Sequence, residues 1–228
     1  MKKLLLWCVI AAAAVLTSCE KQINRQQVIG DIFIEEVVSD NGSGYKLVLS
    51  SDGVFSPVSD LVYSKVVYEE GAKLIMAYNG DGFQVFNLEG QRRGSGDCEY
   101  KKIDVQGDLV YLTDANDKIS LYLPEKGSIF GPYFNILVTG DKIFALGPKG
   151  WGLLDTNYNY LQDMVYEKLY IVNQNDKKYD VMRYRDGAWS MATSDGAEYD
   201  EDSVKAAVKL LEKKFKPDAP IGVIPMSM

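Results

Sequence analysis

The chain has 228 residues, 46% of them hydrophobic, which is enough for one substantial domain or a short repeat array. Its formal net charge is −7 and no basic patch is visible, so nucleic acid is excluded as the main partner. The sequence contains no histidine, which removes the commonest general base and metal ligand and excludes Ser–His and Cys–His nucleophile pairs. We therefore expect neither a cofactor nor an enzyme.

The first 18 residues are typical of a secretory signal peptide. Lys2 and Lys3 precede an apolar run from Leu4 to Leu16. This run, about 13 residues, is shorter than the roughly 20 that a membrane-spanning helix needs. An ordinary signal peptide, cleaved near an incidental cysteine, is one interpretation of the segment.

A second interpretation comes from Leu16-Thr17-Ser18-Cys19, which resembles the lipobox of bacterial lipoproteins. The resemblance implies that the signal is cut before Cys19 and that Cys19 carries acyl chains such as palmitate, with 19–27 as the lipidated cysteine and its polar tether. Each buried methylene adds about 0.8 kcal/mol of membrane affinity, so several chains anchor firmly. The expected location is the cell envelope, anchored in the outer membrane, with the periplasmic or the surface-facing side left open.

The remaining cysteines predict no disulfide within the mature chain. Cys8 lies in the signal peptide, and Cys98 is then the one thiol that is not lipidated. With no histidine in the sequence to activate it, Cys98 is expected to be a packed strand residue rather than a nucleophile.

Five β-hairpins are predicted after the tether, and Val28–Val38 is predicted as one strand before them. The hairpin turns are rich in Gly, Asp and Asn, and apolar residues alternate along the strands. The paired segments are Tyr45–Ser50 with Val54–Val58, Lys73–Tyr78 with Phe83–Leu88, Leu109–Thr113 with Ile119–Leu123, a strand from Lys142 with one that opens at Trp151-Gly152, and Tyr179–Tyr184 with Trp189–Thr193.

A tyrosine follows each hairpin at a regular interval. Tyr63 and Tyr100 are 37 residues apart, and Tyr133, Tyr166 and Tyr199 follow at intervals of 33 residues. Such a period indicates stacked supersecondary units. We expect an all-β repeat domain over 28–204, with about five hairpin units in a propeller-like ring or an open twisted β array. The alternative is an irregular β meander that happens to be rich in tyrosine.

One unit carries a recognisable motif. Gly150-Trp151-Gly152-Leu153-Leu154-Asp155, followed by Tyr166 and Leu169, resembles the WG (Trp-Gly) repeats of bacterial secreted proteins, and Gly187-Ala188-Trp189 matches in part. The resemblance implies an all-β scaffold that serves as a binding surface and supplies no catalytic residues. Trp151 and Trp189 are candidates either for stacking against a ligand or for packing between repeats, and their matching repeat positions favour packing.

The C-terminal part departs from the repeat. The stretch 203–216 is predicted to be a capping α-helix, with acidic residues before it, lysines at its end and Pro217 after it. The tail 217–228 contains Ile221, Val223 and Ile224 and is expected to pack back on the body.

Three acidic stretches are candidate cation sites. Asp155-x-Asn157-x-Asn159 has the opening spacing of a calcium loop, but it lacks the glycine and glutamate of an EF-hand, so a β-turn is favoured. Asp114-Ala-Asn116-Asp117 is similarly expected to be a turn. Weak calcium binding stays open. Glu198, Asp200, Glu201 and Asp202 are expected to be solvated charges that cap the helix.

The function expected from these features is a membrane-anchored, non-catalytic β-repeat lipoprotein that binds a protein, peptide or glycan. Two alternatives remain. One is a carboxylate-type glycan-processing enzyme on a β scaffold, although no spacing selects a catalytic pair of acids. The other is a structural component of the envelope.

Overall fold

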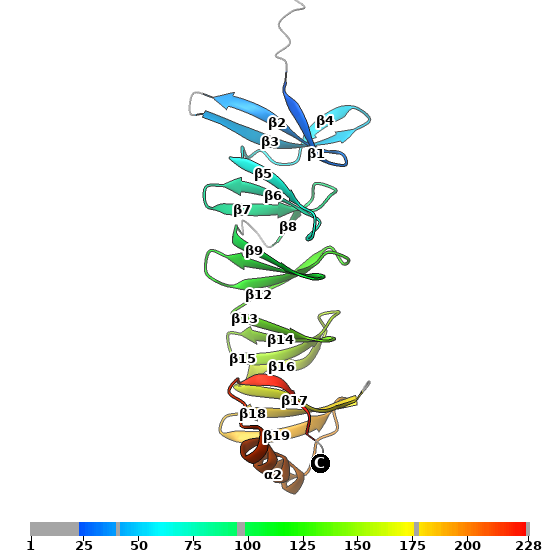
Figure 1. Cartoon of the computed structure of the whole chain (residues 1–228), viewed down its shortest axis with the longest axis vertical. Helices are drawn as coiled ribbons and strands as arrows, with labels where there is room; N and C mark the ends of the chain where they lie inside the picture. Colours follow the sequence, from blue (N-terminus) through cyan, green and yellow to red (C-terminus); the bar gives the residue numbers. More distant parts are fainter. Residues whose placement is uncertain (1–22, 40–41, 95–98, 176–177, 227–228) are drawn as a thin grey trace, which may run out of the picture. The chain divides into compact units, whose positions relative to one another are not determined.

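The computed structural model describes residues 23–39, 42–94, 99–175 and 178–226 (Figure 1). The predicted signal peptide, Cys19 and Cys98 lie outside these ranges. Within them, no helix combines the length and the apolar character that crossing a bilayer requires. The chain divides into two compact units between Glu99 and Tyr100.

The first unit contains two groups of four antiparallel strands in which consecutive strands pair, and each such group of four is called a sheet. The first sheet consists of β1 (Arg25–Ile29), β2 (Ile32–Ser39), β3 (Gly42–Ser51) and β4 (Val54–Pro57). The second consists of β5 (Lys65–Glu69), β6 (Leu74–Asn79), β7 (Gly82–Phe86) and β8 (Arg92–Arg93).

The second unit contains three further sheets and the helical segment. The strands of the first two are β9 (Tyr100–Gln106), β10 (Leu109–Asp114), β11 (Ile119–Leu123) and β12 (Ser128–Tyr133), then β13 (Asn135–Thr139), β14 (Lys142–Gly147), β15 (Gly150–Asp155) and β16 (Tyr160–Tyr166). The last sheet contains β17 (Lys168–Asn175), β18 (Lys178–Arg185), β19 (Ala188–Thr193) and β20 (Ile221–Ile224), in the order β19-β18-β17-β20.

The predicted all-β fold with a C-terminal helix is confirmed. Each of the five predicted hairpins is an antiparallel strand pair, namely β3–β4, β6–β7, β10–β11, β14–β15 and β18–β19. The prediction of one strand over Val28–Val38 is wrong. The chain turns at Gly30, which has a φ of +51°, so β1 and β2 form a hairpin of their own.

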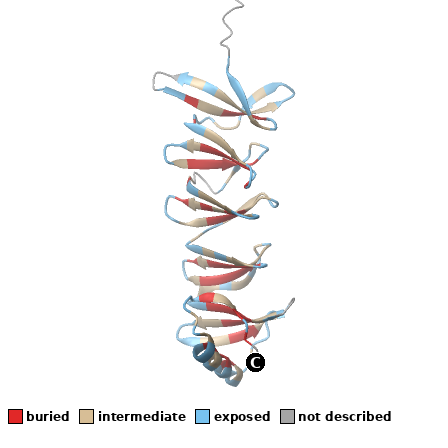
Figure 2. Ribbon diagram, in the orientation of Figure 1, coloured by how far each residue is buried: buried red, intermediate tan, exposed pale blue. Residues whose placement is uncertain are grey.

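Alternating side chains bury both faces of a sheet. In β14, Ile143 and Ala145 belong to one apolar cluster with Leu121 of β11, while Phe144 belongs to another with Leu169 of β17. Successive residues of a strand point to opposite faces, so in the second unit one set of residues packs against the preceding sheet and the other set packs against the following sheet. Figure 2 colours the buried residues of these strands. In the first unit Ile32 and Leu47 pack in the same way against Ile75 and Phe86. This stacking is what the predicted repeat requires.

The last sheet is covered by a helix instead of another sheet. The α-helix α2 (Glu201–Leu210) continues into a π-helical turn over Leu211–Phe215. Val204, Ala207 and Leu211 pack against Tyr170, Val172, Met182 and Met191 of the sheet. The tail then returns, and β20 pairs in parallel with β17. The tail therefore packs on the body, as expected, and the helix begins at Glu201, two residues before its predicted start.

Candidate functional site: the grooves beside Trp189

The two tryptophans lie in equivalent places of two hairpins. Trp151 pairs with Leu146 across β14–β15, and Trp189 pairs with Tyr184 across β18–β19, in each case one residue from the turn end of the ladder. Trp151 is 7% exposed and packs in the cluster with Phe144 and Leu169. Trp189 is only partly buried, on the rim of the cluster beneath α2. The structure thus places Trp151 in the core between two sheets and Trp189 at a surface.

The glycines beside Trp151 make room for β16. A Cβ on Gly150 would lie 2.7–2.8 Å from backbone atoms of Val165 and Tyr166, and a Cβ on Gly152 would lie 3.0 Å from the Gln162 carbonyl oxygen. Gly150 also has a φ of +143°, a conformation that other residues rarely adopt. The Trp-Gly motif therefore combines a core tryptophan with glycines that let the fourth strand approach closely.

The preceding sheet makes the same approach with a glycine on the other strand. Ser120 of β11 corresponds to Gly152, and the glycine of this sheet is Gly131, on β12. A Cβ on Gly131 would lie 3.0–3.2 Å from atoms of Ile119 and Ser120. Where the third and fourth strands of these sheets cross, one of the two carries a glycine. The glycine is on the third strand, β15, in one sheet and on the fourth strand, β12, in the other.

Ala188 and Ser190 occupy the corresponding positions beside Trp189. In the described part of the chain, β19 forms a ladder with β18 and, on its other side, an isolated bridge between Ala192 and Glu198. At Asp200 the chain leaves this edge and starts α2. Among the described residues, no strand therefore lies beside Trp189 on the side away from β18, and side chains are tolerated where β15 requires glycine.

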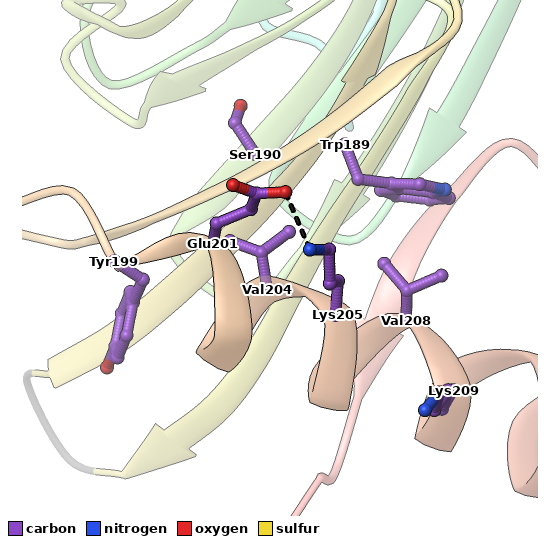
Figure 3. Close-up of a pocket in the computed structure, with 8 residues that line it drawn as sticks. All are labelled: Trp189, Ser190, Tyr199, Glu201, Val204, Lys205, Val208 and Lys209. Carbon is purple, nitrogen blue, oxygen red and sulfur yellow. Dashed lines mark ion pairs between the residues drawn. The ribbon is translucent and has the colours of Figure 1, made fainter.

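A groove opens along this edge, between β19 and α2 (Figure 3). Its volume is about 600 Å³, within the range of ligand pockets. The lining combines an aromatic ring, aliphatic side chains and charged groups: Trp189, Ser190, Tyr199, Glu201, Val204, Lys205, Val208 and Lys209. Glu201 and Lys205 form an ion pair of 2.6 Å, so the one acidic residue of the groove is already paired and Lys209 adds a further positive charge.

A second groove of about 410 Å³ also reaches Trp189. It is lined by Lys168, Tyr170, Tyr184, Trp189, Leu211, Glu212, Lys216 and Pro217. The ring centroids of Tyr184 and Tyr170 lie 5.1 Å and 6.1 Å from that of Trp189, and the Lys168 Nζ lies 5.9 Å from the Trp189 ring. The Tyr170 hydroxyl donates a 2.8 Å hydrogen bond to the Ala219 carbonyl, and burial raises its pKa. Trp189 is therefore an aromatic wall shared by two grooves.

The proposed calcium turns use their carboxylates locally. Asp155 accepts hydrogen bonds from the backbone N–H groups of Asn157 and Asn159 and from the Asn159 side chain. Lys126 Nζ donates to the Thr156 carbonyl and to Asn157 Oδ1 of the same turn. Asp114 likewise accepts from two backbone N–H groups of its turn. Both stretches are β-turns, as favoured from the sequence.

The acidic cluster before the helix is divided among separate roles. Glu198 pairs with Arg183, Glu201 pairs with Lys205, and the Asp200 carboxylate caps α2 by accepting from the Ser203 N–H. These hydrogen bonds from the Ser203 backbone and side chain lower the pKa of Asp200. Across the described ranges, no group of three or more acidic, cysteine or histidine side chains is arranged to hold a metal ion.

The sequence analysis named Trp189 but missed the grooves. The grooves exist because the chain turns away from β19 into α2. No local sequence pattern at Trp189 predicts this turn. One signal was present: Ala188 and Ser190 replace the glycines that Trp151 has on either side.

No protein-family model matches the chain, and no curated protein matches it. Among solved structures, it is similar to HIRA(644–1017), at 14% identity and a TM-score of 0.27 over 63% of this chain and 56% of that chain. It is also similar to BamB from Moraxella catarrhalis, at 13% identity and a TM-score of 0.25 over 75% of this chain and 60% of that chain.

A third similar structure is the WD40 β-propeller domain of Doa1, at 11% identity and a TM-score of 0.25 over 76% of this chain and 66% of that chain. The chain spans 56% and 43% of the first two solved structures it matches, about half of their length. TM-scores this low carry no argument about function, so the proposals below rest on the residues of this chain.

Proposed function

We propose that this protein is a lipid-anchored, WG-type β-repeat lipoprotein of the bacterial cell envelope that binds a partner without catalysing a reaction. The observation that supports binding is the pair of grooves that meet at Trp189. A large, partly buried aromatic ring next to aliphatic and lysine side chains is a combination typical of binding sites for peptides and glycans. Each groove is lined by a single carboxylate, Glu201 or Glu212, whereas glycoside hydrolysis uses two.

The anchoring half of the proposal rests on Cys19 and the lipobox before it. Bacteria that express the full chain and are fed an alkyne analogue of palmitate are expected to label it, and Cys19→Ala is expected to abolish the label and release the protein from the membrane fraction. Retention of the label in Cys19→Ala would contradict anchoring at this residue. Protease treatment of intact cells then decides which side of the outer membrane the protein faces.

The binding half is tested with the purified full chain in detergent. We expect it to retain a partner from envelope extract or a glycan on an array, and Trp189→Ala to weaken that binding about tenfold or more, as truncation of a central aromatic does. Tyr160→Ala is the matched control, because Tyr160 is 61% exposed on β16 and lines neither groove. Equal loss in both variants, or no ligand together with a clear hydrolase activity, would overturn the proposal.

A further inference from the structure

The groove between β19 and α2 lies at an open sheet edge. Trp189 and Ser190 are consecutive strand residues, so their side chains point to opposite faces of the sheet. A groove that contacts both of them therefore runs along the edge of β19 rather than over one face.

The backbone N–H and C=O of Trp189 point away from β18. The Met191 carbonyl accepts a hydrogen bond of 2.9 Å from Tyr199, and the Thr193 N–H donates one of 2.8 Å to Ala197, so these two residues direct their backbone groups away from β18. In an antiparallel ladder this direction alternates along the strand. Trp189, two residues before Met191, therefore directs its N–H and C=O toward the same edge.

The neighbouring repeat shows what occupies the equivalent edge. β16 pairs antiparallel with β15 as far as Tyr166, which lies opposite Trp151. In the last sheet the corresponding segment stops at Tyr199, opposite Met191, and the chain then enters α2. Along Ala188–Ser190, the described residues thus place no strand on the side of β19 that faces away from β18.

The charge of the groove indicates what such a strand carries. The whole chain is acidic, with 32 Asp and Glu against 25 Lys and Arg. The groove reverses this balance, because Lys205 and Lys209 line it against Glu201 alone. An occupant with acidic side chains complements this surface.

We propose that an extended peptide bearing acidic side chains binds along β19 as an additional antiparallel strand at this edge, through the N–H and C=O of Trp189. The main-chain hydrogen bonds supply affinity, and contacts with the Trp189 ring, Val204 and Val208 supply selectivity, as in other cases of strand addition. This inference rests on the proposed function, since it names the ligand class of the same site.

The experiment selects random peptides of about ten residues, the length of a long strand, on the purified full chain in detergent. Selected sequences are expected to be rich in β-branched and acidic residues. Synthetic copies are then N-methylated at one position at a time. A methyl group at the one position whose N–H meets the Trp189 carbonyl is expected to reduce affinity about tenfold or more by removing a backbone donor, and methyl groups at the other positions are expected to have little effect.

A second experiment tests the role of charge by changing two lysines of the same helical segment. Lys209→Glu is expected to reduce the affinity for the selected peptides about tenfold. Lys213 lines neither groove, so Lys213→Glu is expected to leave this affinity unchanged. Circular dichroism of both variants confirms that the fold is retained.

The outcomes separate this inference from the proposed function. If no peptide is selected, or if N-methylation acts equally at all positions, strand addition is overturned. If a glycan nevertheless binds in a manner that depends on Trp189, the binding function stands. If neither peptides, glycans nor envelope proteins bind, the proposed function falls as well.

Discussion

The β13–β16 sheet and the last sheet contain the same hairpin with the same tryptophan, but the surroundings of the ring differ. Trp151 lies opposite Tyr166 of β16, in a core shared with the next sheet. Trp189 lies on the edge strand β19, where the described residues place no strand beside it, and α2 packs over the same face of the sheet. The same local motif thus produces a core residue in one repeat and a groove wall in the terminal repeat. The difference comes from the residues that follow the hairpin.

The residues beside each tryptophan differ in a way that matches these surroundings. Gly150 and Gly152 are required where β16 crosses, because a Cβ at either position would meet the backbone of that strand. Ala188 and Ser190 stand where no strand crosses. In this chain, the tryptophan that has a glycine on both sides lies beside a further strand, β16. The tryptophan without these glycines lies on the edge strand β19.

The largest difference is expected between the two tryptophan truncations. Trp151→Ala should lower the free energy of unfolding by about 3–5 kcal/mol, because it empties a buried site between two sheets. Trp189→Ala should cost about 1–2 kcal/mol, because part of the ring is already in water. Urea unfolding of both variants measures the difference. Equal costs would show that the two environments are not distinct in the way described.

The helix α2, which covers the last sheet in place of another sheet, is expected to make a comparable contribution to the free energy of unfolding. Leu211 is 2% exposed in the cluster with Tyr170 and Met182, so Leu211→Ala should cost about 2–5 kcal/mol and reduce the helical signal. Exposed Lys214 is the control, and Lys214→Ala should change the unfolding free energy by less than about 0.5 kcal/mol. An unchanged midpoint for Leu211→Ala would mean that α2 does not stabilise the last sheet.

Exchanging the small residues should give a smaller and asymmetric effect. Gly150→Ala forces a side chain against the backbone of Tyr166 at a φ of +143° and should cost about 2–3 kcal/mol. The reciprocal change, Ala188→Gly, meets no crossing strand and should cost less than about 1 kcal/mol. Thermal melting of the two variants tests this, and similar losses at both positions would contradict the role assigned to the glycine.

The smallest expected effect concerns pH and is confined to the last sheet. The pKa of Asp200 is below its ordinary value of 3.8 because it accepts hydrogen bonds from Ser203. The folded chain therefore binds fewer protons than the unfolded chain. This contribution to stability is complete above about pH 3.8 and is lost as the pH falls through the lowered pKa.

Asp200→Asn keeps a side-chain acceptor for the cap but removes the titrating group. Its helical signal should therefore fall less steeply between pH 4 and pH 3 than that of the unchanged chain, as followed by circular dichroism. The control is Asp202→Asn, which leaves the Asp200 cap intact and should retain the steeper fall. Identical profiles for Asp200→Asn and the unchanged chain would show that the cap does not titrate in this range.

Much of the fold was predictable because its units are local. Hairpin turns and alternating apolar residues identified five strand pairs, and the charge pattern around 203–216 identified the helix within two residues of its start. Val28–Val38 was misassigned because its apolar residues continue through Gly30, so that only the turn geometry separates β1 from β2. The parallel pairing of β20 with β17 joins segments far apart in the sequence, and no local pattern specifies such a partner.

The equal spacing of the tyrosines predicted the repeat but not the place of its last member. Tyr199 keeps the interval of 33 residues, yet it lies opposite Met191, whereas Tyr166 lies opposite Trp151. The sequence by itself determined the hairpins, the repeat, the capping helix and the two tryptophans, because turns, periodicity and charge act between near neighbours. Only the tertiary structure decided that Trp151 is covered and Trp189 is not, because burial depends on which distant segment packs against each ring.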